Sequence, residues 1–268
     1  MTLQRFARDG LVLNYRDIGT GPAVFFQHGL GGDEKQVAEV FPDDVPVRRL
    51  TLECRGHGAS GLGPKERLSI VTFAEDLAAL ALALGIERAI VGGISMGAAV
   101  GLRLAVHRRD LVRGLILARP AWVAETAPSN IAPYALVADL LSRFPPAEAR
   151  LRFEATAIAA SLAQDAPDNL ASLRSFFDRP EPLPLADLLG AVAAAPPGVT
   201  AAEIAAIRVP TLVIGHGVDL AHPMEVAVRL ARLIPTARLV EITPKAIDRG
   251  RYVADFRKTL LSFLREVG

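Results

Sequence analysis

The sequence has a single cysteine, Cys54, among its 268 residues. One cysteine excludes an internal disulfide framework and every multi-cysteine metal site. The His, Asp and Glu residues show no compact ligand spacing such as H-E-x-x-H, and no G-x-G-x-x-G pattern follows the first predicted strand. These absences argue against a metal centre and against a dinucleotide, so we expect neither a metal nor a cofactor.

The chain also lacks a long apolar run and an excess of charge of either sign. The longest uncharged run, residues 188–202, is broken by glycines and prolines, and it is shorter than the roughly 20 residues that span a bilayer. Lys and Arg number 30 against 29 Asp and Glu, which leaves no basic surplus to follow a phosphate backbone. The opening MTLQRFARDG lacks the charged-then-apolar order of a signal peptide. We expect a cytoplasmic protein that binds neither nucleic acid nor a membrane.

Hydrophobic residues make up 51% of the chain, which is enough for a large core, and they fall into short runs separated by helical patterns. Runs 3–8 and 11–17 flank Asp9-Gly10, a strong hairpin turn pair. Alternating strands and helices imply a mainly parallel sheet flanked by helices, so the fold class is α/β with an N-terminal antiparallel hairpin. Further strands are predicted at 23–27, 47–52, 89–91, 114–118, 211–215 and 238–242, and helices at 73–84, 96–107, 224–233 and 252–266.

Residues 120–208 break this alternation. They are rich in Ala and Leu, contain several X-Pro breaks and show no clear strand. The stretch is too long for a plain loop. We therefore predict a helical cap insertion over the carboxyl edge of the sheet, which divides the core into 1–119 and 209–268.

The strongest chemical signal is Gly93-Ile94-Ser95-Met96-Gly97, which fits the G-x-S-x-G pattern. It directly follows a predicted strand and directly precedes a predicted helix, as a turn that presents a nucleophilic serine requires. The flanking glycines let the backbone turn sharply at Ser95. The start of the following helix favours negative charge beside it. We therefore predict that Ser95 is a nucleophile.

At this point the sequence resembles the α/β-hydrolase superfamily, over nearly the whole chain. The resemblance implies the fold of that superfamily and a cofactor-free hydrolase, but no particular substrate. Four segments carry it in order: His28-Gly29-Leu30-Gly31-Gly32, Cys54-Arg55-Gly56-His57-Gly58-Ala59-Ser60, the G-x-S-x-G turn, and Val209-Pro210-Thr211-Leu212-Val213-Ile214-Gly215 leading to Asp219.

The resemblance also assigns roles. Ser95 would attack the substrate, and the backbone N–H groups of Leu30 and Met96 would form the oxyanion hole. Asp219 matches the position of the catalytic acid. The alternative acid position, after the strand at 114–118, holds Arg119, so Asp219 has no rival there.

The base that the superfamily uses is missing from its usual place. Residues 243–251, the loop after the last predicted strand, contain no His, and all five histidines lie earlier in the chain. His222, in the same loop as Asp219, is one candidate base, because triads are defined by geometry rather than chain order. Its place before Pro223 equally suits the start of a helix. Lys245, in the vacated loop, is the runner-up base or a solvated surface lysine, and a third hypothesis has no base and binds a ligand without turnover.

Three residues are candidates for substrate contact. Arg119 and Trp122 lie where the insertion leaves the sheet, a point above the nucleophile in this fold. Trp122 is expected to form a wall of the pocket and Arg119 to hold an anion, with a core Trp and an internally paired Arg as the alternative. His28 is expected to shape the oxyanion loop beside the substrate. The expected function is a serine hydrolase that cleaves a small apolar ester or lactone through an acyl-enzyme; a small-molecule binder, or a lyase or isomerase, is the alternative.

Overall fold

The computed structural model describes residues 3–268, and residues 1–2 of the predicted core lie outside the described residues. In this part of the chain eight strands form one sheet in the order β1-β2-β4-β3-β5-β6-β7-β8. β2 pairs antiparallel with β1 and β4, and the other neighbouring pairs are parallel, which confirms the predicted fold class. The strands are β1 Gln4–Arg8, β2 Leu11–Ile18, β3 Ala23–Gln27, β4 Arg48–Glu53, β5 Ala89–Ile94, β6 Val112–Ala118, β7 Thr211–Gly215 and β8 Ala237–Glu241.

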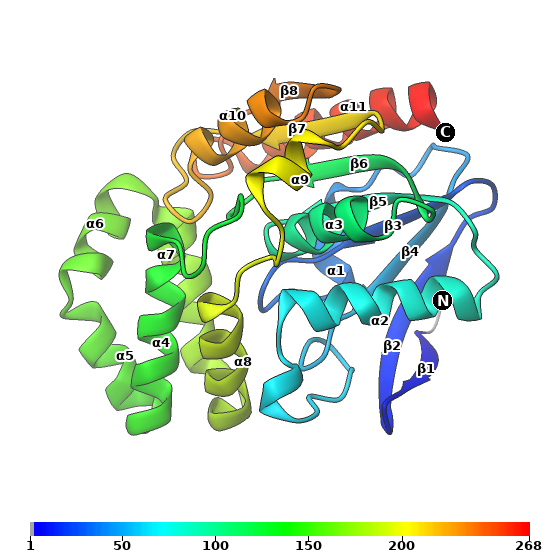
Figure 1. The fold of residues 1–268 in the computed structure, drawn as a ribbon. Coiled ribbons are helices and arrows are strands. Elements are labelled where there is room, and N and C mark those ends of the chain that lie inside the picture. The colour runs from blue at the N-terminus through cyan, green and yellow to red at the C-terminus, as the bar shows by residue number, and fades with distance from the viewer. Residues whose placement is uncertain (1–2) are drawn as a thin grey trace.

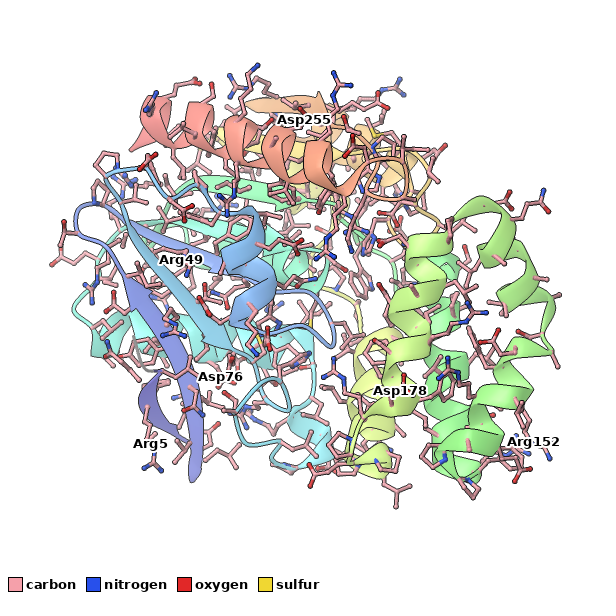
Figure 2. The ribbon with its side chains drawn as sticks, turned by 180° about the vertical axis from the view of Figure 1, so that it is seen from behind. Arg5, Arg49, Asp76, Arg152, Asp178 and Asp255 are labelled. Carbon is pink, nitrogen blue, oxygen red and sulfur yellow. The ribbon has the colours of Figure 1, made fainter. Side chains whose placement is uncertain are left out.

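Helices cover both faces of the sheet, as Figure 1 shows. α1 and α11 pack on the face that carries Phe26, Ile116 and Leu212, and both helices stand before the sheet in Figure 2, the view from behind. α2, α3 and α10 pack on the opposite face, around Phe25 and Leu115. The helices of the core are α1 Glu34–Val40, α2 Ile70–Ala83, α3 Met96–His107, α10 Met224–Leu233 and α11 Arg249–Val267.

No strand falls between β6 and β7 in the described chain, and this stretch folds into helices instead. Figure 1 shows α4 to α8 standing together at one end of the sheet, with α4 beside α8. We call residues 120–208 the insertion. Its elements are the short 3-10 helix η2 Ser129–Ile131, α4 Ala132–Arg143, α5 Pro146–Glu154, α6 Ala157–Asp165, α7 Pro167–Arg174, the 3-10 helix η3 Ser175–Asp178, α8 Pro182–Ala194 and α9 Ala201–Ala205.

Most predicted boundaries agree with the structure to within a few residues, and α1 was not predicted. This helix has only seven residues and begins after Asp33, whose carboxylate accepts the N–H of Lys35. α1 matters for the site because Gln36, in its first turn, accepts the N–H of Gly29 at 2.7 Å. The loop that precedes α1 is thereby fixed at the carboxyl end of β3. No helix among residues 3–268 combines the length and the apolar character needed to cross a membrane.

Candidate active site

Ser95 occupies a strained turn between β5 and α3. Its backbone has φ 55° and ψ −110°, a region that costs a non-glycine residue about 1–3 kcal/mol. The turn depends on its two glycines, because a Cβ on Gly93 would clash with the carbonyl of Gln27, and a Cβ on Gly97 would lie 2.5 Å from the same oxygen. Ser95 also donates its N–H to Ala118 O at 2.9 Å. The structure therefore gives Ser95 the geometry that the G-x-S-x-G pattern predicts.

The predicted oxyanion loop lies against Ser95. A Cβ built on Gly29 would stand 3.5 Å from the Ser95 Cβ, and the loop closes with a hydrogen bond from Gly32 N–H to Gly29 O. Among the backbone groups that the structure describes, neither Leu30 N–H nor Met96 N–H has a hydrogen-bond acceptor. Both N–H groups are therefore available to an oxyanion, and Met96 adds the positive end of α3.

Asp219 and His222 come together in the loop after β7. His222 Nδ1 lies 2.9 Å from Asp219 Oδ1 and 3.0 Å from Oδ2. Both residues expose only 7% of their surface. Asp219 Oδ1 also accepts the side-chain N–H of Asn169, at 2.9 Å. The structure thus pairs the predicted acid with the predicted base, through the nitrogen that an orienting acid should hold.

Arg119 brings a positive charge to the same carboxylate. Its Nε and Nη2 lie 2.8 and 2.7 Å from Asp219 Oδ2, and its Nη2 lies 3.3 Å from His222 Nδ1. The aromatic ring of Tyr252 stands 5.9 Å from the guanidinium. The group that we expected to hold a substrate anion therefore pairs with a carboxylate of the protein itself, as the alternative hypothesis for Arg119 holds.

These charges set the protonation of the pair. Burial alone would raise the pKa of Asp219, but Arg119 and His222 hold that pKa well below its usual range. Burial lowers the pKa of His222, and the Asp219 carboxylate offsets only part of that effect while Arg119 adds to it. At neutral pH Asp219 is therefore ionised and His222 is neutral, the form that a general base requires.

The described residues show no hydrogen bond between the Ser95 hydroxyl and any imidazole. General-base contacts are commonly long before substrate binds and tighten in the complex. Lys245, the runner-up base, lies 2.9 Å from Asp168 of α7. Lys245 is therefore engaged in an ion pair with the insertion.

The other predicted contacts are buried. His28 donates through Nδ1 to Gly29 O at 2.9 Å and accepts the N–H of Cys54 through Nε2 at 3.1 Å, so its ring joins the oxyanion loop to the loop after β4. The His57 ring lies 4.7 Å from that of His28. His57 Nδ1 donates to Arg55 O at 2.9 Å, and burial holds the pKa of His57 well below its usual value. Trp122 exposes 2% of its surface and packs in the main core, which agrees with the alternative of a core Trp.

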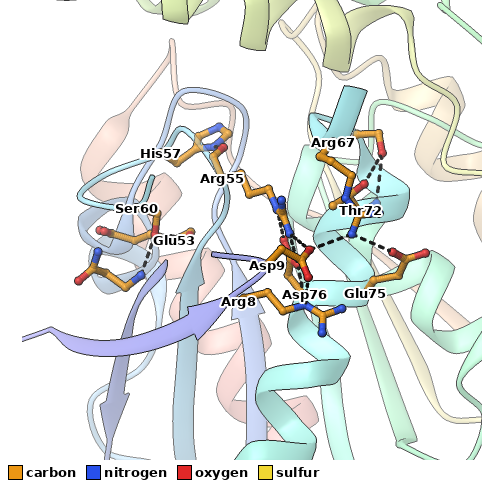
Figure 3. Close-up of polar contacts among 12 residues, drawn as sticks. Arg8, Asp9, Glu53, Arg55, His57, Ser60, Arg67, Thr72, Glu75 and Asp76 are labelled. Atoms are coloured by element: carbon orange, nitrogen blue, oxygen red, sulfur yellow. Dashed lines mark hydrogen bonds and ion pairs between the residues drawn. The ribbon is translucent and has the colours of Figure 1, made fainter. Parts of the chain in front are cut away.

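A buried arginine anchors the loop that carries His57 (Figure 3). Arg55 binds Asp76 of α2 through Nε at 2.7 Å and Nη2 at 2.9 Å, and it binds Asp9 at the tip of the hairpin at 2.6 Å. Figure 3 shows the His57 ring on the other side of this loop from the carboxylates. The network therefore fixes residues 54–60 at the carboxyl end of β4.

The site contains residues for which the sequence offered no motif, and they come from the insertion. Asn169 and Asp168 lie on α7, and Tyr134 lies on α4 with its ring 6.0 Å from that of Phe176. Burial raises the pKa of Tyr134 to about 12. No group of three or more His, Cys, Asp or Glu side chains within residues 3–268 is placed to hold a metal ion. Nothing in the spacing of these residues along the chain could have predicted that Asn169 meets Asp219.

Comparisons with known proteins agree with the fold. A family model described as "alpha/beta hydrolase fold" matches residues 22–245. The chain is 29% identical, over 260 residues, to a putative carbamate hydrolase RutD of Pseudomonas savastanoi pv. phaseolicola, covering 91% of this chain and 93% of that protein. It is 29% identical over 255 residues to the AB hydrolase superfamily protein YisY of Bacillus subtilis, covering 86% of each. The solved enol-lactonase from Burkholderia xenovorans LB400 is similar at a TM-score of 0.73 and 28% identity, covering 98% of this chain and 100% of that one.

Proposed function

The chain belongs to the α/β-hydrolase fold family, and from this premise we propose that it is a serine hydrolase of small, uncharged, apolar esters or lactones. The observation that carries the proposal is the Ser95 turn, with its positive φ and the two glycines that no larger residue can replace. A strained backbone persists only where the surrounding structure holds it, and such strain is concentrated at active sites. The relatives named carbamate hydrolase and enol-lactonase support a reaction at a carbonyl carbon.

The proposed reaction is acyl transfer through Ser95. The Ser95 hydroxyl oxygen attacks the carbonyl carbon while its proton passes to His222 Nε2, and Asp219 holds the imidazole through Nδ1. The oxyanion accepts the N–H groups of Leu30 and Met96, each worth roughly 3–4 kcal/mol in the transition state. The C–O bond to the leaving group then breaks and the imidazolium returns the proton to that oxygen. Water, deprotonated by the same imidazole, then attacks the acyl carbon, the bond from that carbon to Ser95 Oγ breaks, and the imidazolium returns the proton to Oγ as the acid leaves.

The charges around the site favour an uncharged substrate. Arg119 pairs with Asp219 and Lys245 pairs with Asp168, so each cation already has its own carboxylate. To bind Arg119, a substrate carboxylate would have to displace the Asp219 carboxylate, which would then be a buried charge without a partner. In this proposal the insertion acts as a cap, and its apolar helices receive the apolar part of the substrate.

A second candidate function rests on a specific observation. Arg119 forms an ion pair with the acid Asp219, and no hydrogen bond joins Ser95 to an imidazole among residues 3–268. A protein with this arrangement could bind a small molecule without turnover, or carry out a lyase or isomerase step that needs no acyl-enzyme. Both candidate functions use the same site, and they differ in whether Ser95 is acylated by the substrate and then released by water.

Hydrolysis assays separate the two. We would measure the release of p-nitrophenol from acetate and butyrate esters, and of acid from γ-butyrolactone, with the wild type, Ser95→Ala, His222→Ala and His107→Ala. His107 lies at the far end of α3 and bonds to Gly198 O, so His107→Ala is a matched control. The proposal predicts no turnover by Ser95→Ala, a loss of at least about 100-fold in His222→Ala and wild-type rates in His107→Ala. Folded wild type that hydrolyses none of these substrates would favour the second candidate, and Ser95→Ala with full activity would refute Ser95 as the nucleophile.

A further inference from the structure

Two asparagines of the insertion hold the peptide that lies between Asp219 and His222. Asn169 Oδ1 accepts the N–H of Ala221 at 2.9 Å. From the other side, Asn130 Nδ2 donates to Ala221 O at 2.8 Å. Both polar atoms of one backbone residue in the acid loop are therefore bound by side chains from another part of the chain.

Asn169 also determines how the Asp219 carboxylate lies. Its Nδ2 donates to Asp219 Oδ1 at 2.9 Å, the oxygen that also accepts the backbone N–H of His222 at 3.2 Å. The second oxygen, Oδ2, accepts both bonds from Arg119 and lies 3.0 Å from His222 Nδ1. Asn169 thus opposes a rotation of the carboxylate that would give both oxygens to Arg119 and leave His222 without its orienting partner.

The orientation of the Asn169 amide follows from its partners. An exchange of its O and N atoms would set oxygen against a carboxylate and N–H against N–H, so only the observed orientation satisfies both partners. The side chain exposes 5% of its surface, and the low dielectric of such a site strengthens its hydrogen bonds. One residue earlier on α7, Asp168 binds Lys245 of the loop after β8. A single turn of α7 is therefore joined to both loops that carry the candidate acid and bases.

We propose that Asn169 is a positioning residue for the reaction, and that together with Asn130 it holds Asp219 and His222 in their working orientation, so that the insertion completes the site. The inference rests on the proposed function. It adds that Asn169, a residue outside the sheet, orients the acid Asp219. It also adds that Asp219 and His222 reach their working orientation when the insertion packs against the loop after β7.

Three variants of α7 test the proposal by kinetics. Asn169→Ala removes both bonds, Asn169→Asp keeps the shape but replaces the donor with a second carboxylate, and Ser172→Ala removes a hydroxyl that contacts only Asp168 O of the same helix. A positioning role predicts that Asn169→Ala loses roughly 10- to 100-fold in kcat with little change in KM. Asn169→Asp should be at least as impaired, and Ser172→Ala should match the wild type. Wild-type kcat in Asn169→Ala or Asn169→Asp would overturn the proposal, because each change removes the bond that Asn169 donates to the Asp219 carboxylate.

Hydrogen exchange tests the same contacts without catalysis. The proposal predicts faster amide exchange of a peptide covering residues 217–223 in both Asn169→Ala and Asn130→Ala, and unchanged exchange in Ser172→Ala. Unchanged exchange in the two asparagine variants would overturn it. A wild type without hydrolytic activity would refute the proposed function alone, since the exchange experiment still decides whether the asparagines hold this loop.

Discussion

Replacing Arg119 with Met would leave Asp219 as a buried carboxylate without its main counter-charge. The two side chains expose 9% and 1% of their surface, so water screens their interaction poorly. Two unit charges about 4 Å apart attract by roughly 4 kcal/mol at an effective dielectric constant near 20. Removal of one member of a buried ion pair typically costs about 3–5 kcal/mol, because the remaining charge stays buried.

We therefore expect Arg119→Met to lower the free energy of unfolding by about 3–5 kcal/mol at pH 7, and the melting temperature by roughly 6–20 °C. The double variant Arg119→Met/Asp219→Asn removes both charges and should recover about 2 kcal/mol or more of that loss. Urea titration followed by the fluorescence of Trp122, the one tryptophan in the sequence, measures both values.

The penalty should also depend on pH. Arg119 holds the pKa of Asp219 down in the wild type, so that stability is present above the unfolded pKa near 4 and is lost as pH falls. Without Arg119, burial raises the pKa of Asp219, so its carboxylate takes up a proton as the pH falls and the buried charge is removed. The difference in unfolding free energy between Arg119→Met and the wild type therefore narrows toward pH 4. Arg119 also lowers the pKa of His222, so the acidic limb of the pH profile of kcat/KM should move to higher pH in Arg119→Met. Two results would refute this account of the pair. One is a loss of unfolding free energy below about 1 kcal/mol in Arg119→Met, and the other is an equal loss in the double variant Arg119→Met/Asp219→Asn.

Three other substitutions test the account elsewhere. Gly97→Ala should abolish esterase activity and destabilise the fold, because its Cβ would lie 2.5 Å from Gln27 O; a fully active, stable Gly97→Ala would contradict the elbow geometry. Lys245→Ala should keep kcat within about threefold and cost at most about 1 kcal/mol, because the lost pair with Asp168 is partly exposed; a 100-fold loss of kcat would instead identify a base. Arg55→Met should cost about 3 kcal/mol in urea titrations, because it leaves the buried Asp76 carboxylate with only the longer contact to Arg8 in Figure 3, and an unchanged midpoint would show that this network contributes little.

The fold and the Ser95 turn could be predicted because their causes are local. Short apolar runs identify β3 and β7, and Gly93 and Gly97 mark the turn that only glycine permits. The start of α2 was predicted three residues late, although Ser69, which caps the helix by accepting Thr72 N–H, is a local signal for that start. α1 was missed because seven residues carry too little periodic signal.

The acid network could be predicted only in part, because its contacts join distant segments. The resemblance placed Asp219, and one hypothesis paired Arg119 with an acidic neighbour, but the two lie 100 residues apart in the chain. Asn169 lies 50 residues from Asp219, on a helix without any motif. Only the packing of α7 onto the loop after β7 brings them together, and the apolar pattern of the insertion does not encode that packing.

The most direct test of the central claim, an activated Ser95, is intact-mass analysis after treatment with a fluorophosphonate. The account predicts one adduct per chain in the wild type, none in Ser95→Ala, and labelling of His222→Ala slowed by at least about 100-fold. Folded wild-type protein that gains no adduct, or an equal adduct in Ser95→Ala, would contradict it.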